Sequence, residues 1–183
     1  MLRISATLLA LLALTAAASA QVPTSGNIFF GYSYASAQVF SQDHNNLNGW
    51  NGSLEGKVFP WVGIVADISG HYGSDDVVVP CLPPGPCSTI RADASVYNVL
   101  FGPRVSASVG KIRPFAHALF GAGHVSTNGF NSDTSFATAL GGGIDYRMFP
   151  VVGWRVQADY VQDRFFGDTQ NNFRLSTGIV LHF

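Results

Sequence analysis

Apolar and polar residues alternate with a period of two along most of this chain, and this pattern restricts the fold more than any other feature. The final segment, NNFRLSTGIVLHF, places Phe, Leu, Thr, Ile, Leu and Phe at its odd positions, whereas Arg, Ser, Gly and His are among the even ones. Successive side chains of a β-strand point to opposite faces, so each such segment predicts a strand with one apolar face. The pattern occurs in eight segments: 27–36, 49–58, 62–73, 94–106, 112–125, 135–148, 152–161 and 172–183.

The connections between these segments alternate in length. Those near 59–61, 107–111 and 149–151 are short, whereas the others are longer and rich in Asn, Asp, Ser and Gly. Short connections at one rim and long ones at the other predict an antiparallel up-and-down meander whose two ends face different environments. The motif KVFPWVG recurs as RMFPVVG, and since both copies lie at short turns we interpret them as shared turn chemistry.

The first twenty residues indicate export. Arg3 precedes the apolar stretch 4–17, and Ala18-Ser19-Ala20 is a small-residue cleavage site. An uncleaved membrane anchor would need a longer apolar span. We therefore predict a signal peptide over 1–20 and a single domain over 21–183.

Composition leaves two architectures open for an exported all-β chain. Only 11% of the residues are charged, against about 25% in typical domains, while 47% are hydrophobic and 13% are aromatic. After residue 20 no apolar run approaches the length of a membrane-spanning helix. Strands with one apolar face each are compatible with a soluble sandwich or with a membrane barrel.

The polar faces favour the barrel, because they carry few charges and many small residues. Acids and bases mixed with Gly, Ser, Ala and Asn suit a narrow lumen in which ions pair across the barrel. Asp67 is expected to lie near a lumen base such as Lys57 or Arg104. The segment 112–125 is ambiguous, since Phe115 shares a face with Arg113. The predicted lumen ion-pair network consists of Glu55, Lys57, Asp67, Arg104, Arg113, Asp145, Arg147, Arg155, Asp159 and Arg174.

Aromatic residues cluster near the ends of the apolar faces, as in the two girdles that membrane barrels place at lipid–water interfaces. The apolar face is therefore predicted to contact lipid. The predicted girdles are Tyr34, Trp50, Tyr72, Tyr160 and Phe173 toward the long loops, and Tyr146, Trp154 and Phe183 toward the short turns.

The chain resembles the eight-stranded outer-membrane barrels of Gram-negative bacteria, namely the OmpA-type transmembrane domain and its opacity-protein-like relatives. The resemblance rests on GGGID at 141–145, similar to a glycine-rich signature of that family, and on the last strand ending in Phe183. It implies an outer-membrane location, with lipid and lipopolysaccharide as surroundings. Because the last strand ends at Phe183, we expect no appended peptidoglycan-binding domain of the kind that larger relatives carry. The resemblance also implies an assembly signal read by the barrel-assembly machinery, formed by Phe173, Leu175, Ile179, Leu181 and Phe183.

Barrels of this size are usually filled with side chains, so we expect a structural or surface-interaction role without catalysis. A narrow porin-like channel is the alternative, and the basic excess in the lumen would then favour anions. A more remote alternative is a lipid A-modifying hydrolase in which His124 activates Ser126 and Asp133 orients the histidine. Lipid A deacylases have a His-x-Ser pair, but theirs lies near the end of the chain and Asn follows the serine directly, whereas Thr127 follows Ser126 here.

Three further expectations concern the loops and possible ligands. Cys81 and Cys87 are expected to form a short loop disulfide in an oxidising compartment, because two thiolates alone leave a zinc site half built. No cofactor, metal or nucleic-acid partner is predicted, and oligomeric state stays open. Loop acids outnumber loop bases, which suits solvated loops or bridging to lipopolysaccharide phosphates through divalent cations. These residues are Asp43, Asp75, Asp76, Asp93, Asp133, Asp163 and Asp168, against Arg91 and Arg164.

Overall fold

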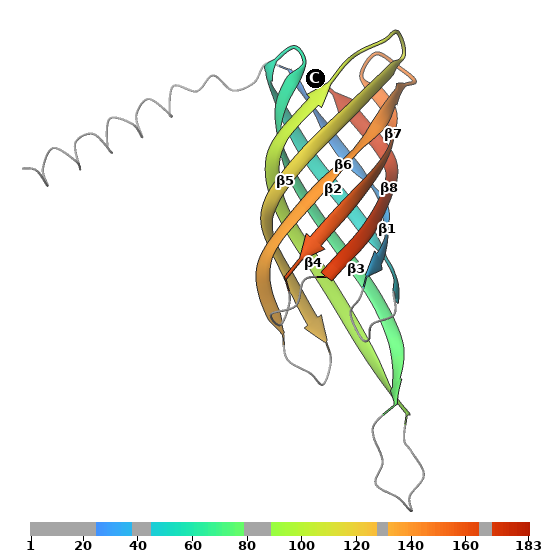
Figure 1. Cartoon of the computed structure of the whole chain (residues 1–183). Helices are drawn as coiled ribbons and strands as arrows, with labels where there is room; N and C mark the ends of the chain where they lie inside the picture. The colour runs from blue at the N-terminus through green and yellow to red at the C-terminus, as the bar shows by residue number, and fades with distance from the viewer. Residues whose placement is uncertain (1–24, 38–44, 79–88, 128–131, 165–169) are drawn as a thin grey trace, which may run out of the picture.

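The computed structural model describes residues 25–37, 45–78, 89–127, 132–164 and 170–183. Each strand pairs antiparallel with its neighbour in the chain, and β1 also pairs with β8, so the sheet closes into a barrel (Figure 1). In this part of the chain no helix has the length and hydrophobicity needed to span a membrane. The strands are β1 (Gly26–Ala37), β2 (Asn45–Phe59), β3 (Val62–Val78), β4 (Thr89–Ser106), β5 (Ile112–Thr127), β6 (Asp133–Arg147), β7 (Val152–Asp163) and β8 (Gln170–His182).

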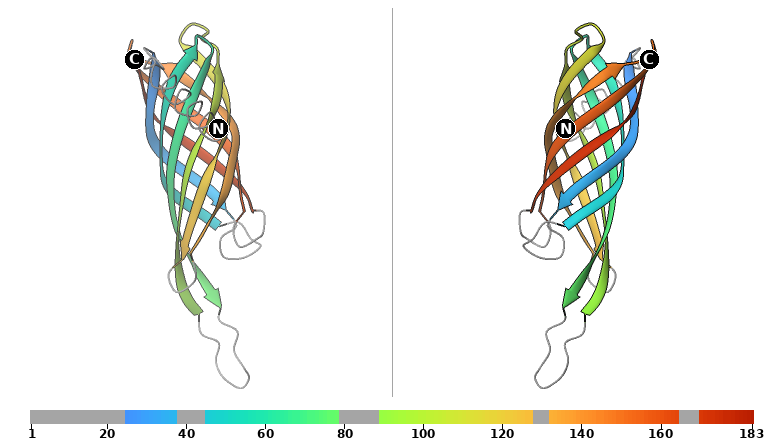
Figure 2. Two further views of the ribbon diagram at one scale, coloured as in Figure 1. Left: turned by 90° about the vertical axis from the view of Figure 1, so that its left-hand side faces the viewer. Right: turned by 90° about the vertical axis from the view of Figure 1, so that its right-hand side faces the viewer.

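The closed eight-stranded barrel confirms the fold predicted from the alternation. The main difference is the length of the β3–β4 hairpin, whose pairing continues from Ser74↔Asp93 to Val78↔Thr89, beyond the predicted strand ends. Figures 1 and 2 show this hairpin projecting past the other strands at the long-loop end. Alternation could not reveal this extension, because a ribbon that has left the wall no longer separates two different environments.

The register fixes the width of the barrel. Following paired residues once around the wall from Arg113 returns to β5 at Gly123, so the shear is ten residues. Eight strands with a stagger of this kind are strongly tilted, and they enclose an interior just wide enough for side chains to fill. Residues far apart in the sequence therefore meet inside the barrel.

Polarity across the wall is the reverse of that in a soluble barrel. Outward-facing Phe101 and Val156 are 54% and 44% exposed, although they are apolar. Inward-facing Asp67 and Arg155 are both 0% exposed, although they are charged. Burying charges while exposing a continuous apolar wall is favourable only where the outer solvent is itself apolar.

At the short-turn end, backbone hydrogen bonds hold a tight turn and join the first strand to the last. Val109 and Ile112 exchange backbone hydrogen bonds across a two-residue turn, in which Gly110 has a φ of 63°, a conformation that L side chains rarely adopt. Gly26 and Phe183 also exchange backbone hydrogen bonds, of 2.9 and 3.1 Å. The start of β1 and the end of β8 therefore lie beside the short turns (Figure 1).

Candidate functional site

The lumen holds nearly all the charged residues that the sequence places there. The exception is Arg147, which is exposed at the short-turn mouth and forms no ion pair within the described residues. Its position follows the alternation, but β6 ends there and the side chain extends beyond the packed interior. Three guanidinium groups are fully buried, those of Arg104, Arg155 and Arg174.

Glu55 on β2 organises the short-turn half of the lumen. Its carboxylate lies 3.2 Å from both Lys57 Nζ and Arg104 Nη1, and 4.0 Å from Arg113 Nη2. Asn27 donates a further hydrogen bond of 2.7 Å to the same carboxylate. One buried acid is therefore shared by three bases, which leaves this half of the lumen with an excess of positive charge.

Arg174 on β8 organises the middle of the lumen and shows that the expected partner of Asp67 was wrong. Arg174 Nη1 donates to Asp67 Oδ1 at 2.8 Å, and its Nε and Nη2 donate to Asp159 Oδ2 at 2.9 and 2.7 Å. The bases Lys57 and Arg104 pair with Glu55 instead. The shear brings β8 close to β3 across the narrow interior, a proximity that sequence spacing does not indicate.

His117 on β5 connects the two halves. Its Nε2 lies 2.7 Å from Asp159 Oδ1 and its Nδ1 lies 3.1 Å from Arg104 Nη2. Two guanidinium groups lie over the Phe115 ring, with the Cζ atoms of Arg104 and Arg155 4.4 and 4.7 Å from its centroid. These cation–π contacts explain why a phenylalanine lies on the charged face of this strand.

Arg155 on β7 is the third fully buried arginine of the lumen. It pairs with Asp145 through Nε and Nη2, at 2.6 and 2.8 Å. Its Nη2 also donates to Asn27 Oδ1 at 3.0 Å. Because Asn27 also bonds Glu55, hydrogen bonds link all three buried guanidinium groups into one connected lumen network.

The glycine-rich segment on β6 makes room for this network. A Cβ atom on Gly141 would lie 2.1 Å from Asp159 Oδ1 and 2.5 Å from the Ala158 carbonyl oxygen. A Cβ atom on Gly143 would lie 2.3 Å from the Val156 carbonyl oxygen. The segment that carries the family resemblance therefore has a physical role, which is close packing of β7 and of the Asp159 carboxylate against β6.

We expect Gly141→Ala to destabilise the barrel by about 1–3 kcal/mol, because the added methyl group overpacks a site bounded partly by backbone. Gly52→Ala is the matched control, since the nearest atoms to its Cβ would be 3.7 Å away. The measurement is denaturant titration of protein folded into lipid vesicles. Equal midpoints for the two variants would show that Gly141 is not needed for space.

The lumen also contains apolar layers that the sequence reading missed. One apolar cluster lies along β3 to β7, and a second lies nearer the long loops. Apolar residues on both faces of a strand weaken the alternation between apolar and polar positions. These residues could have been assigned to the lumen only from their spacing of two from polar residues on the inward face. The first cluster is Val65, Leu100, Leu119, Ala137, Ala139 and Val161, and the second is Ala35, Leu47, Val96 and Val125.

The predicted loop acids occupy several kinds of position. Asp163 is not a loop residue but ends β7, where it is 1% exposed in the lumen and accepts a hydrogen bond of 2.9 Å from Asn172. It continues the inward phase of Asp159, two strand periods further along. Exposed Arg164 follows it. Five more of the predicted loop residues have their backbones in strands, namely Asp75, Asp76, Arg91, Asp93 and Asp133.

Some of the predictions concern residues outside the described part of the chain. These are Asp43, Asp168, Cys81, Cys87 and the predicted signal peptide.

The structure does not join His124 to Ser126. His124 Nδ1 lies 2.7 Å from Thr134 Oγ1 on the neighbouring strand. Asp133 Oδ1 accepts a hydrogen bond of 2.8 Å from the Thr134 backbone N–H. Among the described residues no group of three His, Cys, Asp or Glu side chains could hold a metal ion.

The outer face of β8 forms an exposed apolar row. The side chains of this row are between 42% and 56% exposed, and they are Phe173, Leu175, Ile179, Leu181 and Phe183. Aromatic side chains near both ends of the wall make polar contacts along it. Trp154 Nε1 donates to Thr177 Oγ1 at 2.8 Å near the short turns, and Tyr97 and Tyr72 join through their hydroxyl groups at 3.0 Å near the long loops.

A closed barrel with an apolar exterior and an ion-paired interior defines an integral membrane barrel of the outer-membrane type. The family model of the outer membrane protein beta-barrel domain matches residues 6–183, and the chain belongs to this family. The protein is accordingly an outer-membrane barrel.

Solved structures share the fold at low sequence identity. The Neisserial surface protein A barrel superposes with a TM-score of 0.65 at 13% identity, covering 86% of this chain and 97% of that one. OprG from Pseudomonas aeruginosa gives a TM-score of 0.60 at 9% identity, covering 88% and 97%. Ail, the attachment invasion locus protein of Yersinia pestis, gives 0.55 at 16% identity, covering 86% and 98%. No curated protein matches the sequence.

Proposed function

We propose that this protein is a non-catalytic outer-membrane barrel with a structural or surface-interaction role, and that its lumen does not conduct. In this proposal the short turns face the periplasm and the long-loop end faces outward. The row of apolar side chains on β8 is proposed to serve as the signal read by the barrel-assembly machinery. Lipid and lipopolysaccharide surround the apolar wall.

The observation that carries the proposal is the filled lumen. Arg104, Arg155 and Arg174 are each at most 1% exposed, and each bonds to acids or amides on other strands. An ion crossing the barrel would have to separate pairs such as Arg174 with Asp67 and Asp159, and breaking buried pairs is costly. The lumen therefore gives no support to a porin-like function. An interaction with another molecule would take place at one of the two ends of the barrel.

The long-loop end supports a surface role because the β3–β4 hairpin continues beyond the wall. A projecting, hydrogen-bonded ribbon presents a preformed surface at a distance from the membrane. Two barrels of the same fold are named as a surface protein and as an attachment locus protein. We extend that kind of role to this chain as a proposal. The placement of His124 against Thr134 gives the hydrolase alternative no support.

Conductance in planar bilayers tests the closed lumen. We expect the folded protein to add no steady current, whereas a known porin inserted in the same way opens stepwise. Correct folding is checked on the same sample by resistance to denaturation in detergent. Stepwise, ion-selective currents from the folded protein would refute the proposal and favour a narrow pore.

A further inference from the structure

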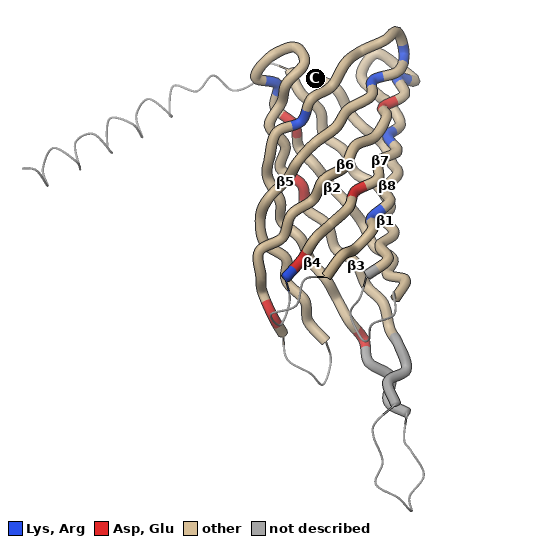
Figure 3. Tube along the Cα trace, in the orientation of Figure 1, with Lys and Arg blue, Asp and Glu red and all other residues tan. Residues whose placement is uncertain are grey.

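Basic side chains gather around a hollow at the short-turn mouth. The hollow has a volume of about 280 Å³, and Lys57, Arg113, Arg147, His182 and Ser108 are among its lining residues. A water molecule takes up about 30 Å³ in the liquid, so this space is large enough for a small anion together with several waters. Figure 3 shows that the Lys and Arg residues of the barrel concentrate at this end.

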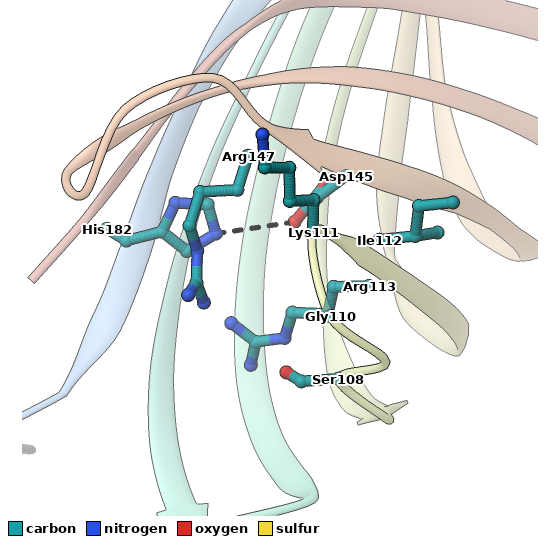
Figure 4. A pocket seen from close by; sticks show the side chains of 8 residues that line it. All are labelled: Ser108, Gly110, Lys111, Ile112, Arg113, Asp145, Arg147 and His182. Atoms are coloured by element: carbon teal, nitrogen blue, oxygen red, sulfur yellow. Dashed lines mark ion pairs between the residues drawn. The ribbon is translucent and has the colours of Figure 1, made fainter.

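A second, much smaller hollow of about 10 Å³ adjoins the first. It shares Ser108, Arg113, Arg147 and His182 with the larger one and adds Lys111 and Asp145. In Figure 4 the guanidinium groups of Arg113 and Arg147 project into the space beside the His182 ring. The two hollows therefore form one site at the mouth, which we call the mouth site.

The acids near the mouth site are already shared among bases. Glu55 contacts Lys57, Arg104 and Arg113, and Asp145 is bonded to Arg155 through two nitrogens. Asp145 also lies 3.6 Å from His182 Nε2. Within the described residues, neither Lys111 nor Arg147 has an ion-pair partner. Basic side chains at the mouth site thus outnumber the acidic side chains beside it, Glu55 and Asp145.

Several polar groups at the mouth site share a partner or have none. Lys57 Nζ and the Arg113 guanidinium both donate to one hydroxyl, Ser106 Oγ, at 2.5 Å and at 3.1 and 3.3 Å. Two cations thus share a neutral oxygen. His182 Nδ1 is buried and has no hydrogen-bond partner. An anion with several oxygens would satisfy these groups together.

We propose that the mouth site binds a phosphate group. A phosphate monoester carries about −1.5 to −2 charges at pH 7 and three strong acceptor oxygens, whereas a carboxylate carries one charge and two oxygens. Arginine forks bind such oxygens in pairs. Arg147 and Arg113 are the principal ligands, Lys111 and Lys57 add charge, and His182 adds a hydrogen bond. The phosphate comes from a soluble phosphate compound or from a lipid headgroup at the membrane surface.

The test follows backbone amide chemical shifts of Ser108 and Gly110 by nuclear magnetic resonance. The folded protein in a maltoside detergent is titrated with inorganic phosphate, and with acetate at equal ionic strength. In a second arm, nanodiscs of phosphatidylcholine are compared with nanodiscs that also contain phosphatidate. We expect saturable shifts with phosphate and weaker ones with acetate. Shifts with phosphatidate alone support the site and identify a lipid headgroup as the source.

Arg147→Gln is the test variant, because Arg147 is exposed and makes no ion pair that the fold needs. It should weaken phosphate or phosphatidate binding by at least about tenfold. Arg164→Gln is the matched control, since it removes the same charge from an exposed position at the opposite end. Equal weakening by the two variants, acetate binding as tight as phosphate binding, or no saturable shift in either arm would overturn the proposal.

Discussion

Replacing Arg174 with methionine is expected to destabilise the barrel by about 3–5 kcal/mol, the range for breaking a buried ion pair by removing one partner. Arg174 is 1% exposed and holds both Asp67 and Asp159 through three nitrogens. Methionine is similar in length but has no donor, so two carboxylates would lose their shared base inside the barrel. Ser69 Oγ would lose a hydrogen bond of 3.0 Å as well.

The measurement for Arg174→Met is equilibrium unfolding by denaturant in lipid vesicles, with the midpoint and slope compared to the parent. Arg164→Met is the matched control, because Arg164 is exposed and surface changes usually stay within about 0.5 kcal/mol. Adding Asp67→Asn to Arg174→Met should recover part of the loss, since one of the two stranded charges is removed. A cost for Arg174→Met no larger than that for Arg164→Met would contradict the central position of this base.

The phase of most strands could be predicted from the sequence, with β5 as the ambiguous one, and the reason is physical. Lipid on one side and ion pairs on the other impose opposite demands on successive side chains, so the alternation is strong over the wall. Asp67, Ile68 and Ser69 illustrate this, because Ile68 is 47% exposed and its two neighbours are completely buried. Most of the charged lumen residues therefore followed from the same pattern as the strands.

The partners within the lumen could not be predicted, because they depend on the shear. Arg174 and Asp67 are 107 residues apart in the chain and meet only when β8 and β3 approach each other across the closed barrel. Sequence spacing favoured Lys57 or Arg104 as the partner of Asp67, since those bases lie on strands adjacent to β3. A register set by eight successive pairings is not visible in any one strand.

Residues that break the alternation were the hardest to interpret. Phe115 belongs in the lumen because two guanidinium groups lie over its ring, and Leu119 belongs there because it packs in an apolar layer. Asp163 was assigned to a loop because the predicted strand ended at residue 161, yet its phase continues that of Asp159. Where a strand extends beyond the membrane, its residues are as polar as those of a loop. Only the backbone pairing then shows where the strand ends.

An arginine on the outer wall at mid-height is expected to cost about 2–4 kcal/mol, because a charge in the hydrocarbon core loses its hydration. Val156 is the suitable site. It faces outward, is 44% exposed, and lies on β7 between Trp154 of the short-turn girdle and Tyr160 of the long-loop girdle. We therefore expect Val156→Arg to lower the free energy of unfolding by this amount in vesicles of ordinary thickness.

Gln162→Arg is the matched control for Val156→Arg, since Gln162 is on the same strand and the same face but lies beyond Tyr160. The cost there should fall to about 0–1 kcal/mol, the range for positions near the interface. Ile64→Arg on β3, closer to the short turns, should give an intermediate value. Denaturant titrations of the three variants in vesicles thus measure depth along the wall. If Val156→Arg were tolerated as well as Gln162→Arg, the outer face of β7 would not contact hydrocarbon, and the assignment of this wall to the membrane would be wrong.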